Sequence, residues 1–341
     1  MIGEAVIAEK LKAVLLCSGG LDSIISLHFL VSKGIEVIAL LIITPFCNLT
    51  EDKVYQSMMY NTSRLGVHTK VVELKEEYLE ILRNPKYGFG KAANPCVDCH
   101  ILMLKQAKKV LEEENADFIV TGDVVNQRPF SQKKIRLKTI DRDADVEGLV
   151  LRPLSGKILP QTVPEEKGWI KREDLFNING RGRTSQITIA KAYEIEKYPL
   201  PAGGCVLTDP EFARRFKDLK KFSPDFNLED IALLRYGRHF RLDPQSKLII
   251  SRRQQENDLI LRTVSEDTIL CRVVEHKGPL GVYIGDLSIS AIERAASYIA
   301  MYSKSPRNIL TEVRFWNIEE SFDKTVKTKP LNLEIIHEHL V

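Results

Sequence analysis

Two stretches of this sequence carry residue types that can do chemistry. The stretch SGGLDS at 18–23 follows a short apolar run and precedes apolar residues at helical spacing. Its glycines let a ligand approach the backbone closely, and the free amides at the start of the following helix favour a phosphate group. We therefore predict that it holds the phosphates of a nucleotide. It is neither a Walker A loop nor a GxGxxG loop, because the spacing differs and no Lys follows the glycines.

The second stretch is a CxxC formed by Cys96 and Cys99 in NPCVDCH, joined by the distant Cys205 in PAGGC. Six cysteines in 341 residues make a disulfide scaffold a poor interpretation, and a CxxC in a cytosolic chain indicates metal or redox chemistry. Deprotonated sulfur can bind metal or carry a further sulfur atom.

The other three cysteines carry weaker signals. Cys17 and Cys271 lie in apolar, strand-like runs, so we expect them to be small core residues. Cys47, just past a predicted strand, stays ambiguous.

The elements that must position these residues alternate between apolar strands and helices. We predict strands at 12–17, 35–43, 67–73 and 117–122, and helices at 22–33, 51–65 and 98–114. Continuous apolar strands separated by helices are typical of a parallel sheet covered on both faces, a doubly wound α/β fold. Ligands bind such sheets at the carboxyl ends of the strands, where SGGLDS lies.

A smaller C-terminal α+β domain is expected, because one core rarely grows past about 250 to 300 residues. We place the domains at 1–222 and 223–341. In the second domain PDFNLED indicates a turn and a helix start, and the run from RYGRHF to LILR alternates like strands around a DP turn. SAIERAASYIAMYSKSP reads as one amphipathic helix.

The net charge of +3 is too small to indicate nucleic-acid binding by itself. Local clusters of Lys and Arg are more informative, and they fall at Lys133, Lys134, Arg136 and Lys138, at Arg181 and Arg183, and at Arg214, Arg215, Lys217, Lys220 and Lys221. Such groups suit contacts to RNA phosphates. The sequence has neither a leader pattern at its start nor a long apolar span, so we expect a soluble, cytoplasmic protein that does not enter a membrane.

SGGLDS resembles the SGGxDS pyrophosphate loop (PP-loop) of the ATP pyrophosphatase superfamily, whose members adenylate a carbonyl or amide oxygen. The resemblance implies an adenine nucleotide alpha hydrolase-like fold with bound ATP and Mg²⁺. It assigns phosphate contacts to Ser18, Gly19, Gly20 and Ser23. Asp22 is implied near the phosphates or Mg²⁺.

Other segments resemble tRNA sulfurtransferases. TGDVVNQRPFSQ at 121–132 is similar to a TGE-x-x-GQ-x-x-SQ segment of 4-thiouridine synthetases, with Asp123 in place of Glu, and LRPLSG at 151–156 resembles their LRPL segment. Gly122 joins the expected nucleotide contacts. Asp123 either positions Mg²⁺ or substrate or simply caps the next turn. Cys96 and Cys205 occupy the places of the two working cysteines in tRNA 2-thiouridylases.

These resemblances imply an ATP-dependent tRNA sulfurtransferase that adenylates a uridine carbonyl oxygen and replaces it with sulfur. The expected catalytic residues are Cys96, Cys205, Asp22 and Asp123. The expected partners are tRNA and a sulfur donor, which is a cysteine desulfurase, a sulfur carrier or free sulfide.

The third cysteine bears on the mechanism. Cys96, Cys99 and Cys205 resemble the layout of iron-sulfur tRNA thiolases, in which three thiolates hold a 4Fe-4S cluster and leave one iron open. That layout is favoured here over a cluster-free persulfide or disulfide relay. Zinc is a third interpretation, with His100 as a further ligand. Related iron-sulfur thiolases often pair, which allows a homodimer.

The C-terminal segment resembles the RNA-binding domain of NFACT-type proteins through SRRQQENDLI, a GPxGVYI-type strand and the AAxxxAxYSK helix. It implies RNA binding by this domain; the alternative is a generic α+β appendage. Two other functions stay open. One is a non-catalytic protein that binds ATP and RNA, and the other is an amidotransferase-type ligase acting on a small molecule.

Overall fold

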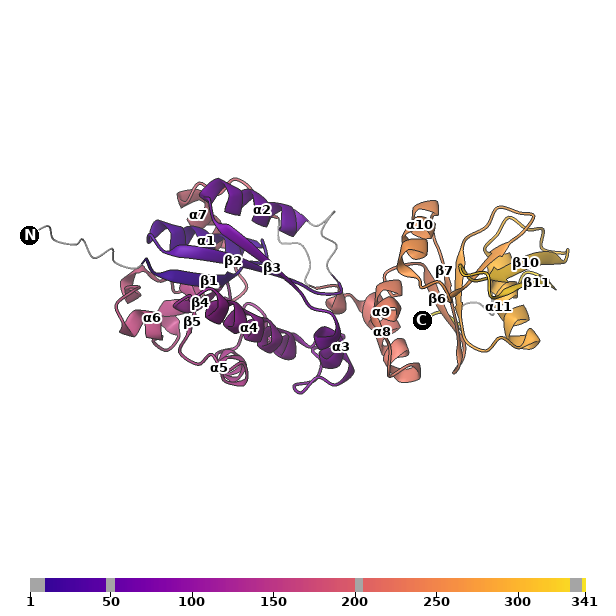
Figure 1. Cartoon of the computed structure of the whole chain (residues 1–341), viewed down its shortest axis with the longest axis horizontal. Coiled ribbons are helices and arrows are strands. Elements are labelled where there is room, and N and C mark those ends of the chain that lie inside the picture. The colour runs from indigo at the N-terminus through magenta and orange to yellow at the C-terminus, as the bar shows by residue number, and fades with distance from the viewer. Residues whose placement is uncertain (1–9, 47–52, 200–204, 332–338) are drawn as a thin grey trace, which may run out of the picture. The chain divides into compact units, whose positions relative to one another are not determined.

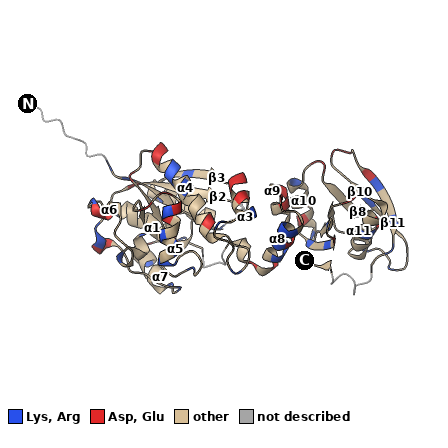
Figure 2. Ribbon diagram, turned by 90° about the horizontal axis from the view of Figure 1, so that it is seen from below, with Lys and Arg blue, Asp and Glu red and all other residues tan. Residues whose placement is uncertain are grey.

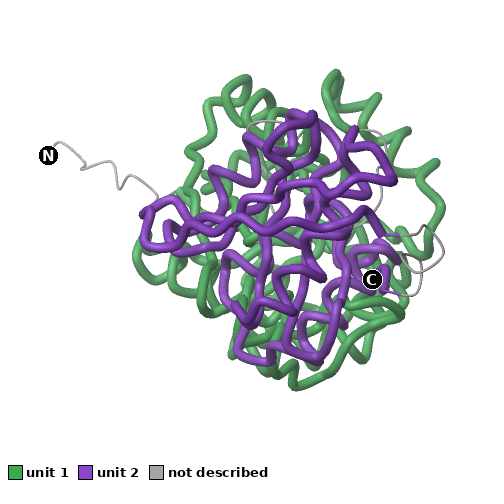
Figure 3. The backbone as a smooth tube through the Cα atoms, turned by 90° about the vertical axis from the view of Figure 1, so that its right-hand side faces the viewer, with its two compact units in different colours: residues 1–205 green, residues 206–341 purple. Residues whose placement is uncertain are grey.

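The structure is a computed structural model, and it describes residues 10–46, 53–199, 205–331 and 339–341. The chain folds as two compact units, Met1–Cys205 and Val206–Val341 (Figures 1 and 3). Each unit has its own sheet and its own core.

Unit 1 is built on a five-stranded sheet in the order β3-β2-β1-β4-β5. Its strands are β1 (Lys12–Leu16), β2 (Glu36–Ile43), β3 (His68–Glu73), β4 (Phe118–Thr121) and β5 (Val150–Leu151). Every adjacent pair is parallel, as the continuous apolar strands predict. Strands β2 and β4 flank β1 on opposite sides, so the strand order reverses at β1, and sheets of this kind bind ligands at such a point beyond the carboxyl ends of the strands.

Helices cover the two faces of this sheet. They are α1 (Leu21–Ser32), α2 (Lys53–Leu65), α3 (Glu76–Arg83), α4 (Cys96–Glu113), α5 (Lys134–Asp143), α6 (Val163–Glu166) and α7 (Thr184–Ala192), with 3₁₀ turns η1 (Pro153–Ile158) and η2 (Arg172–Asp174). In Figure 1, α1, α2 and α7 lie on one side of the sheet and α4 and α5 on the other. The doubly wound α/β fold is confirmed.

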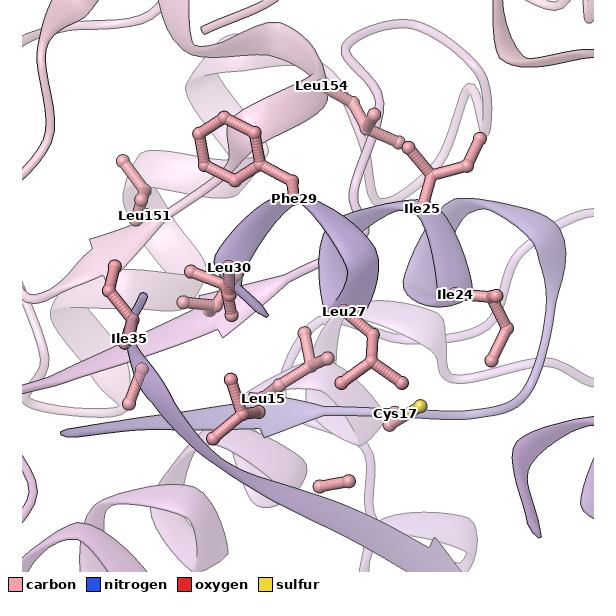
Figure 4. Packing of buried hydrophobic residues seen from close by; sticks show 14 of the residues in the cluster. Leu15, Cys17, Ile24, Ile25, Leu27, Phe29, Leu30, Ile35, Leu151 and Leu154 are labelled. Atoms are coloured by element: carbon pink, nitrogen blue, oxygen red, sulfur yellow. The ribbon is translucent and has the colours of Figure 1, made fainter. Parts of the chain in front are cut away.

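The core of unit 1 lies between α1 and the central strands. Leu15 on β1 packs with Leu27 and Leu30 on α1, and all three are fully buried (Figure 4). The α1 side chains recur at helical spacing, so one apolar face of the helix seals against the sheet. This packing fixes the loop that joins β1 to α1.

Unit 2 is an α+β unit with a six-stranded sheet in the order β11-β10-β8-β9-β7-β6. The strands are β6 (Arg238–Asp243), β7 (Ser246–Ile250), β8 (Ile269–Val273), β9 (Gly281–Ile284), β10 (Thr311–Trp316) and β11 (Asp323–Thr328). The helices are α8 (Pro210–Phe222), α9 (Leu228–Leu233), α10 (Gln254–Thr263) and α11 (Ile289–Met301), preceded by the 3₁₀ turn η3 (Val206–Thr208). The strand pairs are antiparallel, so the predicted class is confirmed.

The boundary between the units lies after Cys205, earlier than the 222/223 boundary expected from the sequence. Helix α8 belongs to the second unit, because Phe216 packs edge-on against Phe226 at 5.7 Å and Arg215 donates a hydrogen bond to the Leu234 carbonyl at 3.0 Å. The buried Phe212, Phe216 and Leu219 recur at helical spacing, so one apolar face of α8 packs within unit 2.

One element of unit 2 is a helix where the sequence predicted a strand. The residues after Ser251 were expected to continue the strand pattern, but Gln254–Thr263 form helix α10, which buries Asn257 and Ile260. The two buried positions are three residues apart, which is helical spacing. Among the described residues, no helix combines the length and the apolar character needed to cross a membrane.

Candidate active site

The loop after β1 is closed by hydrogen bonds from Ser23. The Ser23 hydroxyl accepts from the Gly19 amide at 3.1 Å and donates to the Gly20 carbonyl at 2.9 Å. Ser18 Oγ lies 3.4 Å from Ser23 Oγ and accepts from the Gly20 amide at 3.4 Å. Because Ser23 is 5% exposed and Ser18 is exposed, Ser23 shapes the loop and Ser18 offers its hydroxyl to a ligand.

Two glycines permit close backbone contacts around this loop. Gly19 has a φ of +82°, and a Cβ there would lie 1.9 Å from the Val54 carbonyl oxygen of α2. A Cβ on Gly122, after β4, would lie 2.7 Å from the Ser23 amide nitrogen in the first turn of α1. Packing within the protein therefore requires glycine at both positions. The two contacts let the segment after β1 and the segment after β4 approach their neighbours closely.

Asp22 lies in the first turn of α1, and one of its carboxylate oxygens has no hydrogen-bond partner among the described residues. Its Oδ2 accepts from Gln127 Nε2 at 2.8 Å and lies 4.0 Å from a guanidinium nitrogen of Arg183. Its Oδ1 is buried and has no hydrogen-bond partner among the described residues. Gln186, fully buried on α7, donates to Gln127 Oε1 at 3.3 Å. These residues orient the Asp22 carboxylate while leaving one oxygen available.

The sequence did not identify Gln127 or Gln186, and it assigned Arg183 to an RNA-binding cluster. The signal for Gln127 was its place in the segment that resembles the 4-thiouridine synthetases. Gln186 follows a glycine-rich stretch, and only the fold brings α7 beside α1.

Asp123, just after β4, is held in a polar network. Its Oδ2 accepts from the Thr121 hydroxyl at 2.8 Å and its Oδ1 accepts from Gln132 Nε2 at 2.8 Å. Arg152 Nε lies 3.5 Å from Oδ2, and His100 Nδ1 lies 3.9 Å from Oδ1. Both carboxylate oxygens therefore have partners, in contrast to Asp22.

This network changes the acidity of Asp123. Burial by itself raises the pKa of a carboxyl group, but His100, Arg152 and the hydrogen bonds from Gln132 and Thr121 outweigh it and lower the pKa of Asp123 to about 2. Burial also lowers the pKa of His100, against the attraction of Asp123. Asp123 is thus an anion at neutral pH, fixed in position by its neighbours.

We expect the acid stability of unit 1 to depend on Asp123. Its folded pKa of about 2 lies below the value of 3.8 for an unperturbed Asp, so its contribution is present above about pH 4 and is lost as the pH falls towards 2. The contribution is about 2 kcal/mol at neutral pH. Unfolding followed by Trp169 fluorescence in a Trp316→Phe background, which reports on unit 1, should show Asp123→Asn less stable at pH 6 and nearly equal to the parent at pH 2.

Glu147→Gln is the matched control, because this exposed carboxyl group has no partner in the network. Its effect on the free energy of unfolding should be small at every pH. A stability difference for Asp123→Asn that stays constant from pH 6 to pH 2 would contradict the assignment.

The CxxC lies at the N-terminus of α4. The predicted helix 98–114 starts two residues earlier than expected, so Cys96 is its first residue and Cys99 lies in its first turn. Asn94 Nδ2 donates to Cys96 Sγ at 3.2 Å. Asp98, between the cysteines, accepts from the backbone amides of residues 86–87 at 2.9 and 3.1 Å and is 7% exposed. Asp98 therefore fixes the start of the helix, whose dipole favours anionic sulfur.

Tyr78 on α3 is hydrogen-bonded to Cys99 and lies within electrostatic range of Cys96 and Cys205. Burial raises the pKa of its phenol well above the usual value, and Cys99, Cys205 and Cys96 raise that pKa further, Cys99 also through a hydrogen bond. Cys205, which is 109 residues beyond Cys96, thus lies near enough to α3 to act on the Tyr78 phenol. Tyr78 was not identifiable from the sequence, because a tyrosine in an amphipathic helix is usually a core residue.

The cysteines lie at the same edge of the sheet as the SGGLDS loop. Helix α4 leads into β4, so it runs opposite to the strand and its N-terminus lies at the carboxyl end of the sheet. His100, in the first turn of α4, is 3.9 Å from Asp123, which follows the carboxyl end of β4. Two predicted groups that are 73 residues apart in sequence are therefore brought to one edge of unit 1.

Within the described part of the chain, no three His, Cys, Asp or Glu side chains converge closely enough to hold a single metal ion. His100 faces Asp123. A single-ion zinc site at the CxxC therefore has no support from the geometry.

The remaining predicted cysteines and basic residues have varied surroundings. Cys17 and Cys271 are buried, as expected, and burial raises the pKa of the Cys17 thiol to about 11 and that of Cys271 further. Cys47 lies outside the described residues. Arg215 was expected to contact RNA but is 7% exposed and pairs inside unit 2, whereas Arg214 is exposed.

Comparison with protein families assigns a domain to each unit. Residues 9–158 match the family model described as thiamine biosynthesis protein (ThiI). Residues 237–340 match the model described as the NFACT protein RNA binding domain. The chain thus carries a ThiI-family domain in unit 1 and an NFACT RNA-binding domain in unit 2.

Curated relatives match over part of their length. A tRNA-specific 2-thiouridylase MnmA from Helicobacter hepaticus is 30% identical over 140 residues, which cover 40% of each chain. A probable tRNA sulfurtransferase from Thermococcus kodakarensis is 28% identical over 154 residues, which cover 45% of this chain and 39% of that protein. The chain thus spans about two fifths of the length of these relatives.

Among solved structures, the U34-tRNA thiolase NcsA from Methanococcus maripaludis with its [4Fe-4S] cluster is similar at 18% identity and a TM-score of 0.36. The similarity covers 68% of this chain and 74% of that one.

Proposed function

We propose that this chain, with its ThiI-family domain and its NFACT RNA-binding domain, is an ATP-dependent tRNA sulfurtransferase that converts a uridine to thiouridine. The observation that carries the proposal is the position of the CxxC, which lies at the N-terminus of α4 at the edge of the sheet that also holds the SGGLDS loop. Activation by a nucleotide and delivery of sulfur need these two groups within one site.

The first half of the reaction is activation of the uridine. A carbonyl oxygen is a poor leaving group, so its attack on the α-phosphorus of ATP, with release of pyrophosphate, converts it to a phosphate ester. Gly19, Gly20 and the first amides of α1 provide donors for the phosphates, and the Ser18 hydroxyl is exposed beside them.

Mg²⁺ fits the Asp22 carboxylate better than that of Asp123. Magnesium binds carboxylate oxygens and is usually held in proteins by one or two of them together with substrate phosphates. Asp22 Oδ1 is buried without a hydrogen-bond partner among the described residues, whereas both oxygens of Asp123 are occupied. When bound, Mg²⁺ would neutralise charge on the departing pyrophosphate. We assign Asp123 to positioning His100 and the loop after β4.

The second half is displacement of the adenylated oxygen by sulfur. Three thiols of one unit lie within electrostatic range of Tyr78, and thiolate is the donor type that iron-sulfur clusters take, so the donor set fits a 4Fe-4S cluster. Each thiolate of such a cluster binds a different iron, so the three need not converge on one point. Bound to three cysteines, a cluster would leave one iron open for sulfide. In a cluster-free relay, Cys96 and Cys205 would carry the sulfur and Cys99 would be dispensable.

The RNA is held by unit 2 in this proposal, with further phosphate contacts from exposed Lys and Arg of unit 1 such as Lys133, Lys134 and Lys138. The sulfur donor is a cysteine desulfurase, a sulfur carrier or free sulfide. Pairing of two copies is a further part of the proposal, to be tested by the mass of the protein in solution.

Mass spectrometry of tRNA nucleosides tests the function. A strain that lacks the gene should lose one thiouridine, and the gene should restore it. In vitro, the purified chain with ATP, Mg²⁺, a sulfide source and the unmodified tRNA should form the same nucleoside. Loss of no thiouridine in the deletion strain would overturn the proposal and favour a protein that binds ATP and RNA without catalysis.

A further inference from the structure

Unit 2 contains a cavity of about 270 Å³ between its first two helices and one face of its sheet. The end of α8 and helix α9 form one wall, and strands β6, β7 and β9 form the other. Both helices lie outside residues 9–158 and 237–340, the segments that match known families. The strand residues of the cavity, such as Arg241, Lys247 and Ile249, lie within the matched segment 237–340, so that domain and two helices outside it form the cavity together.

The walls of the cavity are mostly apolar. Leu219 on α8, Leu233 on α9 and Ile249 on β7 are buried side chains that line it. Phe222, at the end of α8, also lines the cavity, and the Arg241 guanidinium lies 4.5 Å from the centre of its ring. A flat apolar group finds both an aliphatic wall and a stacking surface here.

The charged groups at the cavity balance one another. Asp218 accepts two hydrogen bonds from Arg241, at 3.1 and 2.8 Å, and lies 3.1 Å from Lys247 Nζ. Asp230 also lines the cavity and accepts from the Asn227 amide at 2.9 Å. Arg241 and Lys247 line the cavity with Asp230. Asp218, which is not a lining residue, pairs with both cations, so these four groups together carry no net charge. The cavity suits a neutral group with a polar edge better than a phosphate, because an unpaired ion is costly to bury.

The surface beside the cavity is basic. Arg214, Lys217 and Lys221 on α8 are exposed, and their spacing of three and four residues places them on one side of the helix. Figure 2 shows Lys and Arg of α8 in blue. Lys221 Nζ lies 4.8 Å from the centre of the Phe222 ring, so this basic side reaches the cavity wall. Phosphates bound along α8 would bring an attached base to the cavity.

We propose that the cavity receives one unstacked base of an RNA whose backbone lies along α8. A nucleobase is neutral, flat and apolar on its faces, with hydrogen-bonding groups at its edge, and single-stranded RNA is commonly read by such extruded bases. The proposal rests on the RNA binding assigned to unit 2 under the proposed function, and it adds the place and the mode of that binding.

The test uses the full chain and a single-stranded RNA oligonucleotide with a fluorescent label. A set of oligonucleotides, each with one abasic position, should reveal one position at which loss of the base weakens binding about tenfold, because stacking of one base contributes about that much. Ile284→Trp and Gln245→Trp each put an indole at the cavity, from a half-buried and an exposed position. Both should weaken binding of the intact RNA about tenfold and abolish the abasic effect.

Ile284→Val and Gln245→Ala are the matched controls, and they should keep the abasic effect. Lys217→Ala should weaken binding of intact and abasic RNA equally and reduce its salt dependence. The proposal is overturned if no abasic position weakens binding, if the Trp variants keep the effect, or if the chain binds no RNA.

Thiouridine formation, measured separately, distinguishes the two proposals. If the chain forms thiouridine but no abasic position weakens RNA binding, only the proposal that the cavity binds a base is refuted. If the Trp variants remove an abasic effect but the chain forms no thiouridine, only the proposed sulfurtransferase activity is refuted.

Discussion

Cys205→Ser should abolish thiouridine formation while leaving the release of pyrophosphate from ATP intact. A serine hydroxyl has nearly the same shape, but it neither binds iron nor carries a sulfur atom, so only the sulfur half of the reaction is lost. We expect the rate of thiouridine formation to fall on the order of 100-fold or more, since losing one of several residues that act in the same step removes most of their joint effect. Thiouridine per tRNA by mass spectrometry and pyrophosphate by a coupled assay give the two readouts.

Cys205 is well suited to this test, because its side chain is exposed and its replacement should not affect folding. Cys271→Ala is the control, since this thiol is fully buried in unit 2 and contributes packing only. It should lower stability by about 1 to 2 kcal/mol and keep thiolation. Wild-type levels of thiouridine in Cys205→Ser would remove this residue from the mechanism.

Cys99→Ala separates the two sulfur-delivery mechanisms. If three thiolates hold a cluster, the anaerobically purified variant loses iron, acid-labile sulfide, the visible absorbance and thiolation together. In a relay through Cys96 and Cys205, it keeps most of its activity without iron. Full iron retention in the Ala variants of all three cysteines would refute the cluster.

The sequence predicted those features of unit 1 that depend on local pattern. Predicted strands 12–17 and 35–43 correspond to β1 and β2. They could be predicted because a short, continuous apolar run between turn signals is typical of a buried parallel strand. SGGLDS was identifiable for a similar reason, since a short run of residues carries the whole pattern, and Gly19 within it is needed for the close contact with α2.

The rest depends on contacts between distant segments. Tyr78 becomes part of the candidate site only because α3 packs against α4 and Cys205 lies within electrostatic range of its phenol. Gln186 is a polar residue in a helix until α7 meets α1, where it supports Gln127 and Asp22. Periodicity carries no information about which buried polar groups will meet.

The same limit explains the errors in unit 2. Arg215 was grouped with the exposed basic residues of α8, yet it points to the helix face that packs on Leu234. Composition counts the charges of a helix, whereas the face each one occupies depends on what the helix packs against. The exposed Arg214, Lys217 and Lys221 are the part of that cluster available to a ligand.

Gly19→Ala should remove ATP-dependent release of pyrophosphate. The methyl group would meet the Val54 carbonyl oxygen at 1.9 Å, and the φ of +82° is itself unfavourable for alanine, by about 1 to 3 kcal/mol. Since the obstacle is the backbone of α2, no side-chain rotation relieves it, and the loop amides must move from their positions at the start of α1. Displacing backbone donors from a developing charge costs about 100- to 1,000-fold in rate.

Gly20→Ala is the matched control because Gly20 is the next residue of the same loop and its backbone and surroundings accept a methyl group. Its φ is −72°, and the nearest atom to an added Cβ is Ser18 Oγ at 3.5 Å, so the protein itself accommodates the methyl group. If the phosphates of ATP lie against this loop, Gly20→Ala keeps the free energy of unfolding of unit 1 but weakens ATP binding, measured by calorimetry. If both variants bind ATP as the parent does, the nucleotide lies elsewhere, and SGGLDS is only a turn between a strand and a helix.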